Sequence, residues 1–294
     1  MRASRPDTAI PRAQMPDTRT VLITGCSSGI GYASAHLLHA RGWQVVASCR
    51  RQADVDRLRG EGLPCVRLDY EDGSSIETGF REVLELTGGR LDALFNNGAY
   101  AIPGRVEDLP TDALRQIFEA NLFGWHELIR HALPVMRAQG HGRIVQNSSV
   151  LGLIALKYRG AYNATKFALE GLSDTLRIEI ESADIHVSTI EPGPIATKFR
   201  QNAKPQFERW IDWENSPNRK FYERKMIPRL NAGEGDKQPF ELPAEAVARK
   251  LVHALESRRP KPRYYVTTPT YALGVLKRLL PTRLLDKVAK AASS

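Results

Sequence analysis

A tyrosine and a lysine four residues apart, Tyr162 and Lys166, are the pair of side chains in this sequence best suited to moving a proton. Alanines and leucines recur every four residues through the segment GAYNATKFALEGLSDTL, which predicts a helix with both side chains on one face. A phenol titrates at about pH 10, and a neighbouring ammonium lowers its pKa toward the range where it both gives and takes a proton. The pair indicates general acid–base chemistry, and the alternative interpretation is a surface tyrosine over a lysine stem.

A serine, Ser149, stands thirteen residues before this tyrosine, at the end of the predicted strand 143–148. Ligands of open α/β folds bind at the carboxyl edge of the sheet, where a serine hydroxyl can donate a hydrogen bond to a substrate oxygen as charge develops on it. We expect Ser149 to have this role, and the alternative is a serine that caps a turn.

An asparagine, Asn121, lies inside the predicted helix 111–138, which is a poor position for asparagine by propensity. A local rule that is broken inside an element points to function. Its amide, together with a water, would carry protons from solvent toward Lys166. The alternative is an asparagine that hydrogen-bonds a neighbouring carbonyl.

A glycine-rich segment, TGCSSGIG at 24–31, runs from the first predicted strand straight into a helical pattern. Glycine is needed where the backbone turns tightly or approaches a phosphate, and the free N–H groups at a helix start favour a pyrophosphate. An ordinary tight strand–helix turn is the alternative. We predict a dinucleotide site formed by Gly25, Ser27, Ser28, Gly29, Ile30 and Gly31.

The second predicted strand ends at Cys49 and is followed by Arg50, with no acidic residue at that place. An acid here would hold the ribose 2′-hydroxyl of NAD and repel a 2′-phosphate, whereas arginine pairs with a phosphate through two parallel hydrogen bonds. The sequence therefore favours NADP(H) over NAD, unless Arg50 is only a solvated surface charge.

Further cofactor contacts are expected where other predicted strands end. Asp69 is placed to accept from the adenine amino group, and Asn97 to fix the loop under the adenosine ribose, although both residue types are also common in turns. The segment PGPIAT at 192–197 would lie against the nicotinamide carboxamide, or else be a simple turn. Its expected contact residues are Pro192, Gly193, Ile195 and Thr197.

The elements that must position these residues alternate between short apolar runs and longer helical patterns. Such a rhythm predicts an α/β fold with a Rossmann-type, doubly wound parallel sheet of about seven strands in a single domain. Strands are predicted at 20–24, 44–49, 64–68, 91–96, 143–148, 186–191 and 263–267. Helices are predicted at 30–41, 51–60, 74–88, 111–138, 161–182 and 243–257.

The chain divides into a flexible N-terminal tail at 1–18, the main domain at 19–270 and a basic C-terminal extension at 271–294. The aromatic and charged segment 199–240 interrupts the alternation and is interpreted as a substrate lid, because long insertions in compact domains are usually functional. The extension mixes apolar residues with lysines and arginines. Weak peripheral membrane contact is one interpretation of it, and docking on the protein or a subunit is the other.

The net charge of +9 is concentrated at the chain ends, since residues 258–294 carry nine lysines or arginines and one aspartate. A nucleic-acid binder places its charge on a folded face, so we expect no nucleic-acid partner. The three cysteines and seven histidines fit no zinc pattern, so no metal is expected either. No apolar run reaches the roughly 18 residues of a membrane span and no secretory signal is visible, which predicts a cytoplasmic protein.

Together these motifs resemble the short-chain dehydrogenase/reductase family. The glycine loop matches its TGxxxGxG pattern, and the Asn-Asn-Ala-Gly signature appears at 96–99 with its last two residues exchanged. The resemblance implies a catalytic tetrad and a homodimer or homotetramer, and it implies that Lys166 also binds the nicotinamide ribose. The tetrad residues are Asn121, Ser149, Tyr162 and Lys166.

Within the family the sequence is similar to bacterial NADP-dependent aldehyde reductases and to the retinol and 17β-hydroxysteroid dehydrogenase branch, on the basis of TGCSSGIG, Arg50 and the ending RYYVT…VLKRLLP. The expected function is NADP(H)-dependent interconversion of a hydrophobic aldehyde or ketone and its alcohol. A non-catalytic dinucleotide-binding regulator or scaffold is the alternative. No motif identifies the substrate or the direction of the reaction.

Overall fold

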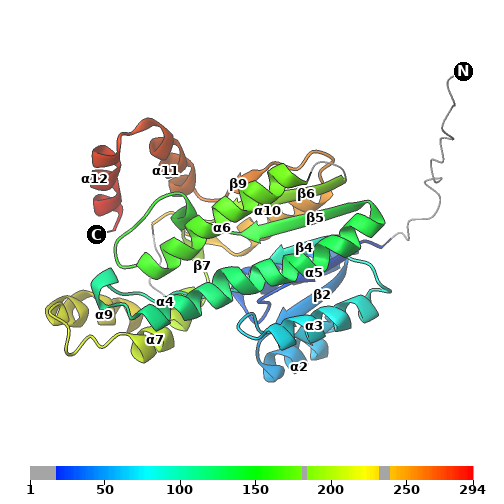
Figure 1. The fold of residues 1–294 in the computed structure, drawn as a ribbon, viewed down its shortest axis with the longest axis horizontal. Helices are drawn as coiled ribbons and strands as arrows, with labels where there is room; N and C mark the ends of the chain where they lie inside the picture. Colours follow the sequence, from blue (N-terminus) through cyan, green and yellow to red (C-terminus); the bar gives the residue numbers. More distant parts are fainter. Residues whose placement is uncertain (1–17, 181–183, 232–238, 294) are drawn as a thin grey trace, which may run out of the picture.

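The computed structural model describes residues 18–180, 184–231 and 239–293. A parallel sheet of seven strands in the order β3-β2-β1-β4-β5-β6-β9 forms its centre, which confirms the predicted fold class (Figure 1). The strands are β1 (Thr20–Ile23), β2 (Gln44–Cys49), β3 (Cys65–Arg67), β4 (Ala93–Asn96), β5 (His141–Asn147), β6 (Asp184–Glu191) and β9 (Arg263–Tyr265). Residues 1–17 of the predicted tail, 1–18, lie outside the described residues.

Helices cover both faces of the sheet because its strands are apolar on both sides. The helices α1, α2 and α10 pack on one face, and α3, α5 and α6 pack on the other. Their bounds are α1 (Gly29–Ala40), α2 (Gln52–Gly60), α3 (Gly73–Leu86), α5 (Gly124–Gln139), α6 (Gly160–Glu179) and α10 (Glu245–Glu256).

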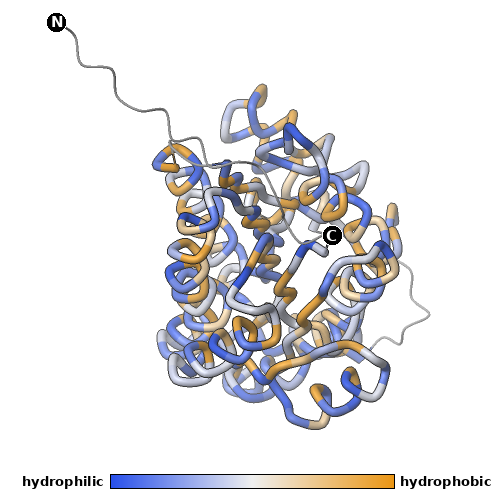
Figure 2. The backbone as a smooth tube through the Cα atoms, turned by 90° about the vertical axis from the view of Figure 1, so that its right-hand side faces the viewer, coloured by the Kyte–Doolittle hydropathy of each residue, from blue (hydrophilic) through white to orange (hydrophobic). Residues whose placement is uncertain are grey.

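The core follows the two-residue period of the strands. In β1, Val21 and Ile23 face the cluster under α1 and α10, while Leu22 faces the cluster under α3 and α5. All three side chains are fully buried. Hydrophobic stretches run along the central strands, and the surrounding helices alternate between hydrophobic and hydrophilic turns (Figure 2). The sheet is therefore a rigid platform from which the loops at its carboxyl edge project.

The long helix predicted at 111–138 is interrupted at the predicted functional asparagine. It consists of α4 (Thr111–Phe118), a π-helical turn (Glu119–Phe123) and α5. Such π-turns inside helices are frequent at functional sites. Propensity could not reveal the interruption because all three segments have the same apolar repeat.

The predicted lid segment is mostly helical where it is described. It contains α7 (Phe199–Trp210), the short α8 (Arg219–Phe221), a π-helical turn (Tyr222–Met226) and α9 (Ile227–Asn231). A small pair of strands, β7 (Ile195–Ala196) and β8 (Leu242–Pro243), closes its base. Apolar side chains of these helices form one buried cluster with Tyr162. The segment thus covers the tyrosine, although its limits as a lid remain a prediction.

The C-terminal extension forms two helices, α11 (Thr268–Leu279) and α12 (Thr282–Ala292), separated at Pro281. It packs on its own chain, since the Ser293 hydroxyl accepts a hydrogen bond of 3.0 Å from the backbone N–H of Lys157. Both helices lie at the same end of the molecule as α7 and α9 (Figure 1). No helix in the described part of the chain is long and apolar enough to cross a membrane.

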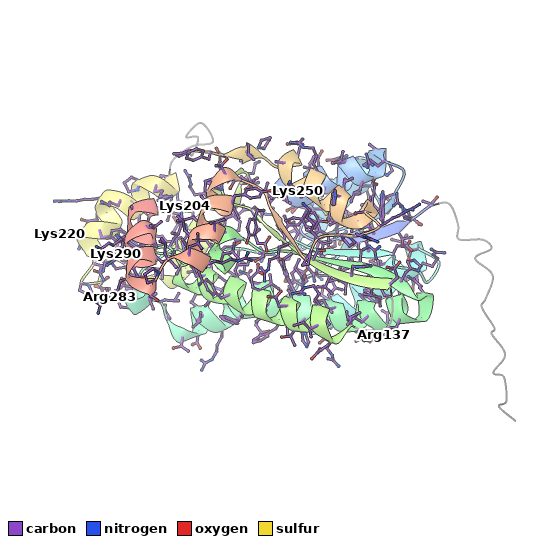
Figure 3. All side chains as sticks on the ribbon, turned by 90° about the horizontal axis from the view of Figure 1, so that it is seen from above. Arg137, Lys204, Lys220, Lys250, Arg283 and Lys290 are labelled. Carbon is purple, nitrogen blue, oxygen red and sulfur yellow. The ribbon has the colours of Figure 1, made fainter. Side chains whose placement is uncertain are left out.

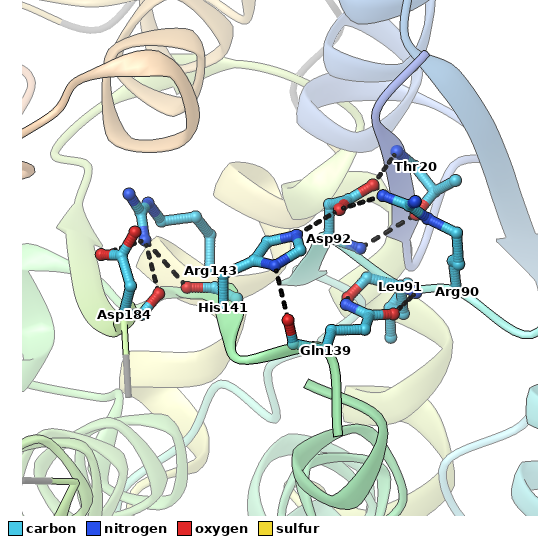
Figure 4. A network of polar contacts seen from close by, with 9 residues as sticks. Thr20, Arg90, Leu91, Asp92, Gln139, His141, Arg143 and Asp184 are labelled. Carbon is cyan, nitrogen blue, oxygen red and sulfur yellow. Dashed lines mark hydrogen bonds and ion pairs between the residues drawn. The ribbon is translucent and has the colours of Figure 1, made fainter. Parts of the chain in front are cut away.

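A buried carboxylate, Asp92, ties together the amino ends of the central strands (Figure 4). It accepts hydrogen bonds from the backbone N–H and the hydroxyl of Thr20, at 2.7 and 3.0 Å, and lies 2.7 Å from Nε2 of His141. Arg90 adds an ion pair of 3.2 Å. These contacts fix β1, β4 and β5 at the edge opposite the loops predicted to bind ligands, so the network serves stability.

Candidate active site

Four loops meet at the carboxyl edge of the sheet and carry the residues predicted to do chemistry. The glycine loop follows β1, Asn97 follows β4, Ser149 follows β5, and the segment 192–197 follows β6. The helix α6 brings Tyr162 and Lys166 to the same edge. Parallel strands point all their carboxyl ends to one side, so residues more than a hundred positions apart converge there.

The Tyr162 side chain is buried, with 8% of the residue exposed, inside the apolar cluster that the lid helices form. Burial raises the pKa of its phenol, while a hydrogen bond with Ser149 and the positive charge of Arg159 act in the opposite direction. We expected the opposing influence to come from Lys166. Lys166 is not among the groups that act on the phenol in this state, although its Nζ lies 5.5 Å from the centre of the Tyr162 ring, so its effect on the tyrosine stays a prediction.

The Lys166 ammonium is fully enclosed. Its Nζ donates a hydrogen bond of 2.8 Å to the carbonyl oxygen of Asn147 and lies 4.3 Å from the centre of the Trp125 ring and 5.5 Å from that of Tyr162. Burial lowers its pKa to about 7, against the attraction of Glu170. The group therefore changes charge near neutral pH, where a small change in its surroundings can shift its protonation.

Ser149 caps a turn, which was its alternative role, and its role toward a substrate oxygen stays a prediction. Its side-chain oxygen accepts a hydrogen bond of 3.1 Å from the backbone N–H of Leu151, which caps the short helical turn Val150–Gly152. A hydroxyl that accepts with its oxygen still has its own proton to donate. The serine is thus fixed by capping and keeps a donor for Tyr162 or for a substrate oxygen.

Asn121 is fully buried in the π-helical turn and forms hydrogen bonds with the loop after β4. Its amide donates to the carbonyl of Tyr100 at 2.9 Å and accepts from the N–H of the same residue at 3.1 Å. A weaker contact of 3.3 Å reaches the Thr165 hydroxyl. None of these hydrogen bonds reaches Lys166, so the predicted proton relay stays a prediction.

The glycine loop is anchored to β4 and β5 by side-chain amides. Asn97 donates to the carbonyls of Thr24 and Gly25, at 2.9 and 3.3 Å, and its oxygen accepts a 2.8 Å bond from Asn147. Gly25 has a positive φ of 67°, and a Cβ there would lie 2.5 Å from the Cα of Gly98. Only glycine fits, and the loop is held rigidly in place.

This loop fits the diphosphate of a dinucleotide. Ser28 precedes α1 without a side-chain capping bond, and the first turn of α1 has no acidic residue, so its backbone N–H groups and dipole remain available to an anion. A Cβ on Gly29 would lie 3.0 Å from the Thr197 side chain, so the segment after β6 closes over the loop. Ser27, Ser28, Gly29 and Ile30 are half-buried at this junction.

The segment 192–197 is an ordered turn that is fixed by hydrogen bonds and close packing. The carbonyl of Pro192 accepts a bond of 2.8 Å from the N–H of Val150, and Ile195 begins β7. A Cβ on Gly193 would lie 2.1 Å from the Thr267 hydroxyl. Gly193 is therefore needed because the chain after β9 leaves no room for a side chain, and the residues next to it in the sequence do not indicate this.

Two further predicted cofactor contacts lie at the ends of neighbouring strands. Arg50 is exposed directly after β2, and its carbonyl accepts a bond of 3.3 Å from Arg67. Nearby, Arg57 donates to the carbonyl of Ser27 in the glycine loop at 2.7 Å. Asp69 accepts from the N–H of Glu71 at 3.1 Å, the turn-forming role that was its alternative.

The family model of the short-chain dehydrogenases matches residues 19–208. The chain belongs to the short-chain dehydrogenase/reductase family. It is thus an oxidoreductase of CH–OH groups that uses a nicotinamide dinucleotide. In the described residues no group of three or more histidines, cysteines or acids is placed to hold a metal.

Several relatives of this short-chain dehydrogenase/reductase match over most of their length. It is 42% identical to the uncharacterized oxidoreductase YbbO of Escherichia coli, covering 92% of this chain and 93% of that one. It is 29% identical to the NADPH-dependent 3-dehydrocapnine reductase of Ornithobacterium rhinotracheale (92% and 95%) and 32% identical to retinol dehydrogenase 8 of Bos taurus (90% and 86%). The crystal structure of a short-chain dehydrogenase from Streptomyces avermitilis has a TM-score of 0.72 at 28% identity, covering 92% of this chain and 94% of that one.

The structure of this short-chain dehydrogenase/reductase adds residues that we did not predict. Arg159 precedes α6, Trp125 encloses the ammonium of Lys166, and Phe199 packs its ring against Tyr162 with centroids 5.3 Å apart. The sequence places Arg159 three residues before the tyrosine, but the residue lies just outside α6, so helical spacing could not predict its effect on the phenol. Trp125 and Phe199 come from elements distant in the sequence, and no sequence pattern indicated their contacts with Lys166 and Tyr162.

Proposed function

We propose that this protein is an NADP(H)-dependent oxidoreductase that interconverts a hydrophobic aldehyde or ketone and its alcohol, with Tyr162 as the group that exchanges the proton. The observation that carries the proposal is the position of this phenol. It is buried among apolar lid side chains, lies near the Ser149 hydroxyl, which acts to lower its pKa, and is within one helical turn of Lys166. Such surroundings suit a substrate with a polar carbonyl on an apolar body.

The catalytic roles follow from the donors at this point. A bound nicotinamide dinucleotide would supply or accept the hydride at the substrate carbon. During reduction the Tyr162 hydroxyl gives its proton to the carbonyl oxygen and becomes a phenolate, while the Ser149 hydroxyl donates a hydrogen bond to the same oxygen. Lys166, with a pKa of about 7, can carry the positive charge that stabilises the phenolate. Oxidation of the alcohol runs the same proton transfer in reverse.

Preference for NADP(H) is proposed from the charges at the end of β2. Arg50, Arg57 and Arg67 surround this point, whereas Asp54 forms ion pairs with Arg51 at 3.0 Å and Arg57 at 3.7 Å. A 2′-phosphate would meet guanidinium groups here and no free carboxylate. The relative named as an NADPH-dependent reductase supports the same preference.

Three of our sequence-based expectations remain predictions. These are the cytoplasmic location, the assembly into a homodimer or homotetramer, and the absence of nucleic-acid partners. The first is supported by Cys26, Cys49 and Cys65, which are buried and unpaired thiols.

The proposed function is tested by following cofactor oxidation with NADPH and with NADH over aliphatic, aromatic, retinoid and steroid carbonyls. We expect turnover of hydrophobic carbonyls with NADPH and its loss in Tyr162→Phe, which removes the phenolic hydroxyl and keeps the ring. Binding of NADPH to the variant, measured by fluorescence titration, should be unchanged. Full turnover by Tyr162→Phe would refute the mechanism, and failure of the unmutated protein to reduce any of these carbonyls would count against the proposed substrate class.

A further inference from the structure

Three arginines lie on elements that border the proposed catalytic tyrosine, and the charge of one of them, Arg159, acts on its phenol. Arg159 is the residue before α6, three positions ahead of Tyr162. Arg200 follows Phe199, whose ring contacts Tyr162, and Arg229 lies in α9, which packs against α7. The three charges also affect one another: burial and the charges of Arg229 and Arg200 lower the pKa of Arg159 to about 10.

None of these guanidinium groups has a carboxylate partner in the described structure. Two acidic residues of the lid form ion pairs elsewhere, Glu208 with Lys204 at 3.8 Å and Glu223 with Arg219 at 2.7 Å, and Asp212 is hydrogen-bonded by Asn215. Arg159 and Arg200 are half-buried and Arg229 is exposed. Like charges that gather without a counter-ion repel each other, so the arrangement is unfavourable by itself. An anion that enters among them would remove this cost.

Arg263 provides a comparison, because it is an arginine with a structural role whose ion-pair partners are part of the protein. Arg263 at the end of the sheet forms ion pairs with Glu170, with Asp174 at 2.6 Å and with Glu191 at 3.0 Å. Its charge is fully balanced inside the fold. The two arginine sites therefore differ: Arg263 has carboxylate partners within the protein, whereas the three-arginine cluster lacks a negatively charged partner among the described residues.

We propose that Arg159, Arg200 and Arg229 bind an anionic group of the substrate, a carboxylate, sulfonate or phosphate attached to its hydrophobic body. This inference rests on the proposed function and specifies its substrate class. The apolar cluster around Tyr162 receives the body, the phenol meets the carbonyl, and the three guanidinium groups hold the anion. Such a substrate is an amphiphilic oxo acid or its hydroxy counterpart.

The surface around the cluster is suited to attracting an anion. Residues 198–231 carry nine lysines or arginines and four acidic residues. The lid residues Lys204 and Lys220 lie at the same end of the molecule as Arg283 and Lys290 of α12 (Figure 3). A cationic end around an apolar site raises the local concentration and the association rate of anionic ligands.

A matched pair of aldehydes tests the proposal: 4-formylbenzoate and its uncharged methyl ester. We expect Arg200→Gln and Arg229→Gln to lower kcat/KM for 4-formylbenzoate about 10- to 100-fold, the effect of one lost charge-assisted hydrogen bond. The same variants should change kcat/KM for the ester by less than about threefold on that reasoning. Arg224→Gln, which removes an exposed lid charge, serves as the control and should leave both values within about twofold.

Two outcomes would overturn the proposal. One is an equal loss for the acid and the ester, which would assign the arginines to folding or to general catalysis. The other is a rise in the KM for NADPH that accounts for both losses, which would assign them to the cofactor.

An equilibrium measurement separates this proposal from the proposed function. Terephthalate carries the same aromatic carboxylate and cannot be reduced at an aldehyde. We titrate it into the protein saturated with NADP⁺ and expect weaker binding to Arg200→Gln than to Arg224→Gln. That result would support the anion site even if no aldehyde is turned over. Equal affinity in both variants would refute it whatever the turnover shows.

Discussion

The ring of Phe199 packs against the ring of Tyr162 with centroids 5.3 Å apart and planes inclined by 66°. This edge-on contact joins the first residue of the lid helix α7 to the proposed proton donor. Because 37% of Phe199 is exposed, the ring lies at the border between the apolar cluster and solvent. We expect a substrate that approaches the phenol to contact this ring, and we therefore predict that the lid takes part in substrate binding.

Phe199→Ala should therefore weaken the binding of hydrophobic carbonyls. An aromatic contact of this kind contributes about 1 kcal/mol beyond its area, so we expect KM to rise about fivefold with a smaller change in kcat. Steady-state kinetics with NADPH and a hydrophobic aldehyde measure both constants. Phe240→Ala, which removes a more exposed phenylalanine of the same segment, is the control. An unchanged KM in Phe199→Ala would show that the ring is displaced without cost.

Arg50→Ala should change the cofactor preference. Loss of a guanidinium–phosphate contact costs about 1.5–3 kcal/mol, so we expect the KM for NADPH to rise about 10- to 100-fold and that for NADH to stay within about twofold. Arg51→Ala is the matched control, because Arg51 forms an ion pair of 3.0 Å with Asp54 and is mostly exposed. Similar affinity of the unmutated protein for both cofactors would contradict the NADP(H) assignment.

Asn121→Ala should destabilise the fold as well as reduce activity. The substitution removes both partners of the Tyr100 backbone and leaves a donor and an acceptor unsatisfied next to a buried helix turn. We expect a loss of about 2–3 kcal/mol in the free energy of unfolding, measured by urea denaturation. Asn215→Ala, where the exposed amide contacts only Asp212, should change it by less than about 0.5 kcal/mol. Equal stabilities would show that water replaces the amide.

The buried Lys166 predicts a pH dependence of stability. Its pKa falls from 10.5 in the unfolded chain to about 7 in the folded protein. Between these values the unfolded state binds one more proton, so the free energy of unfolding increases as pH rises from about 7 toward 10. Below pH 7 both states are protonated, and the full cost of the buried charge is present.

Lys166→Met should remove this dependence. Comparing urea denaturation at pH 7 and pH 9.5, we expect the unmutated protein to gain on the order of 3 kcal/mol relative to Lys166→Met. The comparison with the variant cancels the titration of every other group that keeps its surroundings. A constant difference between the two proteins across this range would mean that the lysine stays charged in the folded state.

The sequence by itself determined the parallel sheet and marked the residues of the proposed tetrad. Continuous apolar runs such as 20–24 and 44–49 predict strands buried on both faces, and the structure places β1 and β2 there. Spacing of four on a helix sets Tyr162 beside Lys166, because helical geometry is local. The glycine loop could also be predicted from local sequence. A positive φ or a close approach of two backbone segments requires glycine at that position in any fold.

Only the tertiary structure decided what surrounds these residues. Arg159, Arg200 and Arg229 are separated by up to seventy positions, and no local pattern indicates that their charges meet near one phenol. Burial is likewise a property of the packed chain: it raises the pKa of Tyr162 and lowers that of Lys166, whereas spacing alone suggested that the lysine acidifies the tyrosine. Local spacing fixes which side chains share a face, while the solvation and the charges that set their reactivity come from elements distant in the sequence.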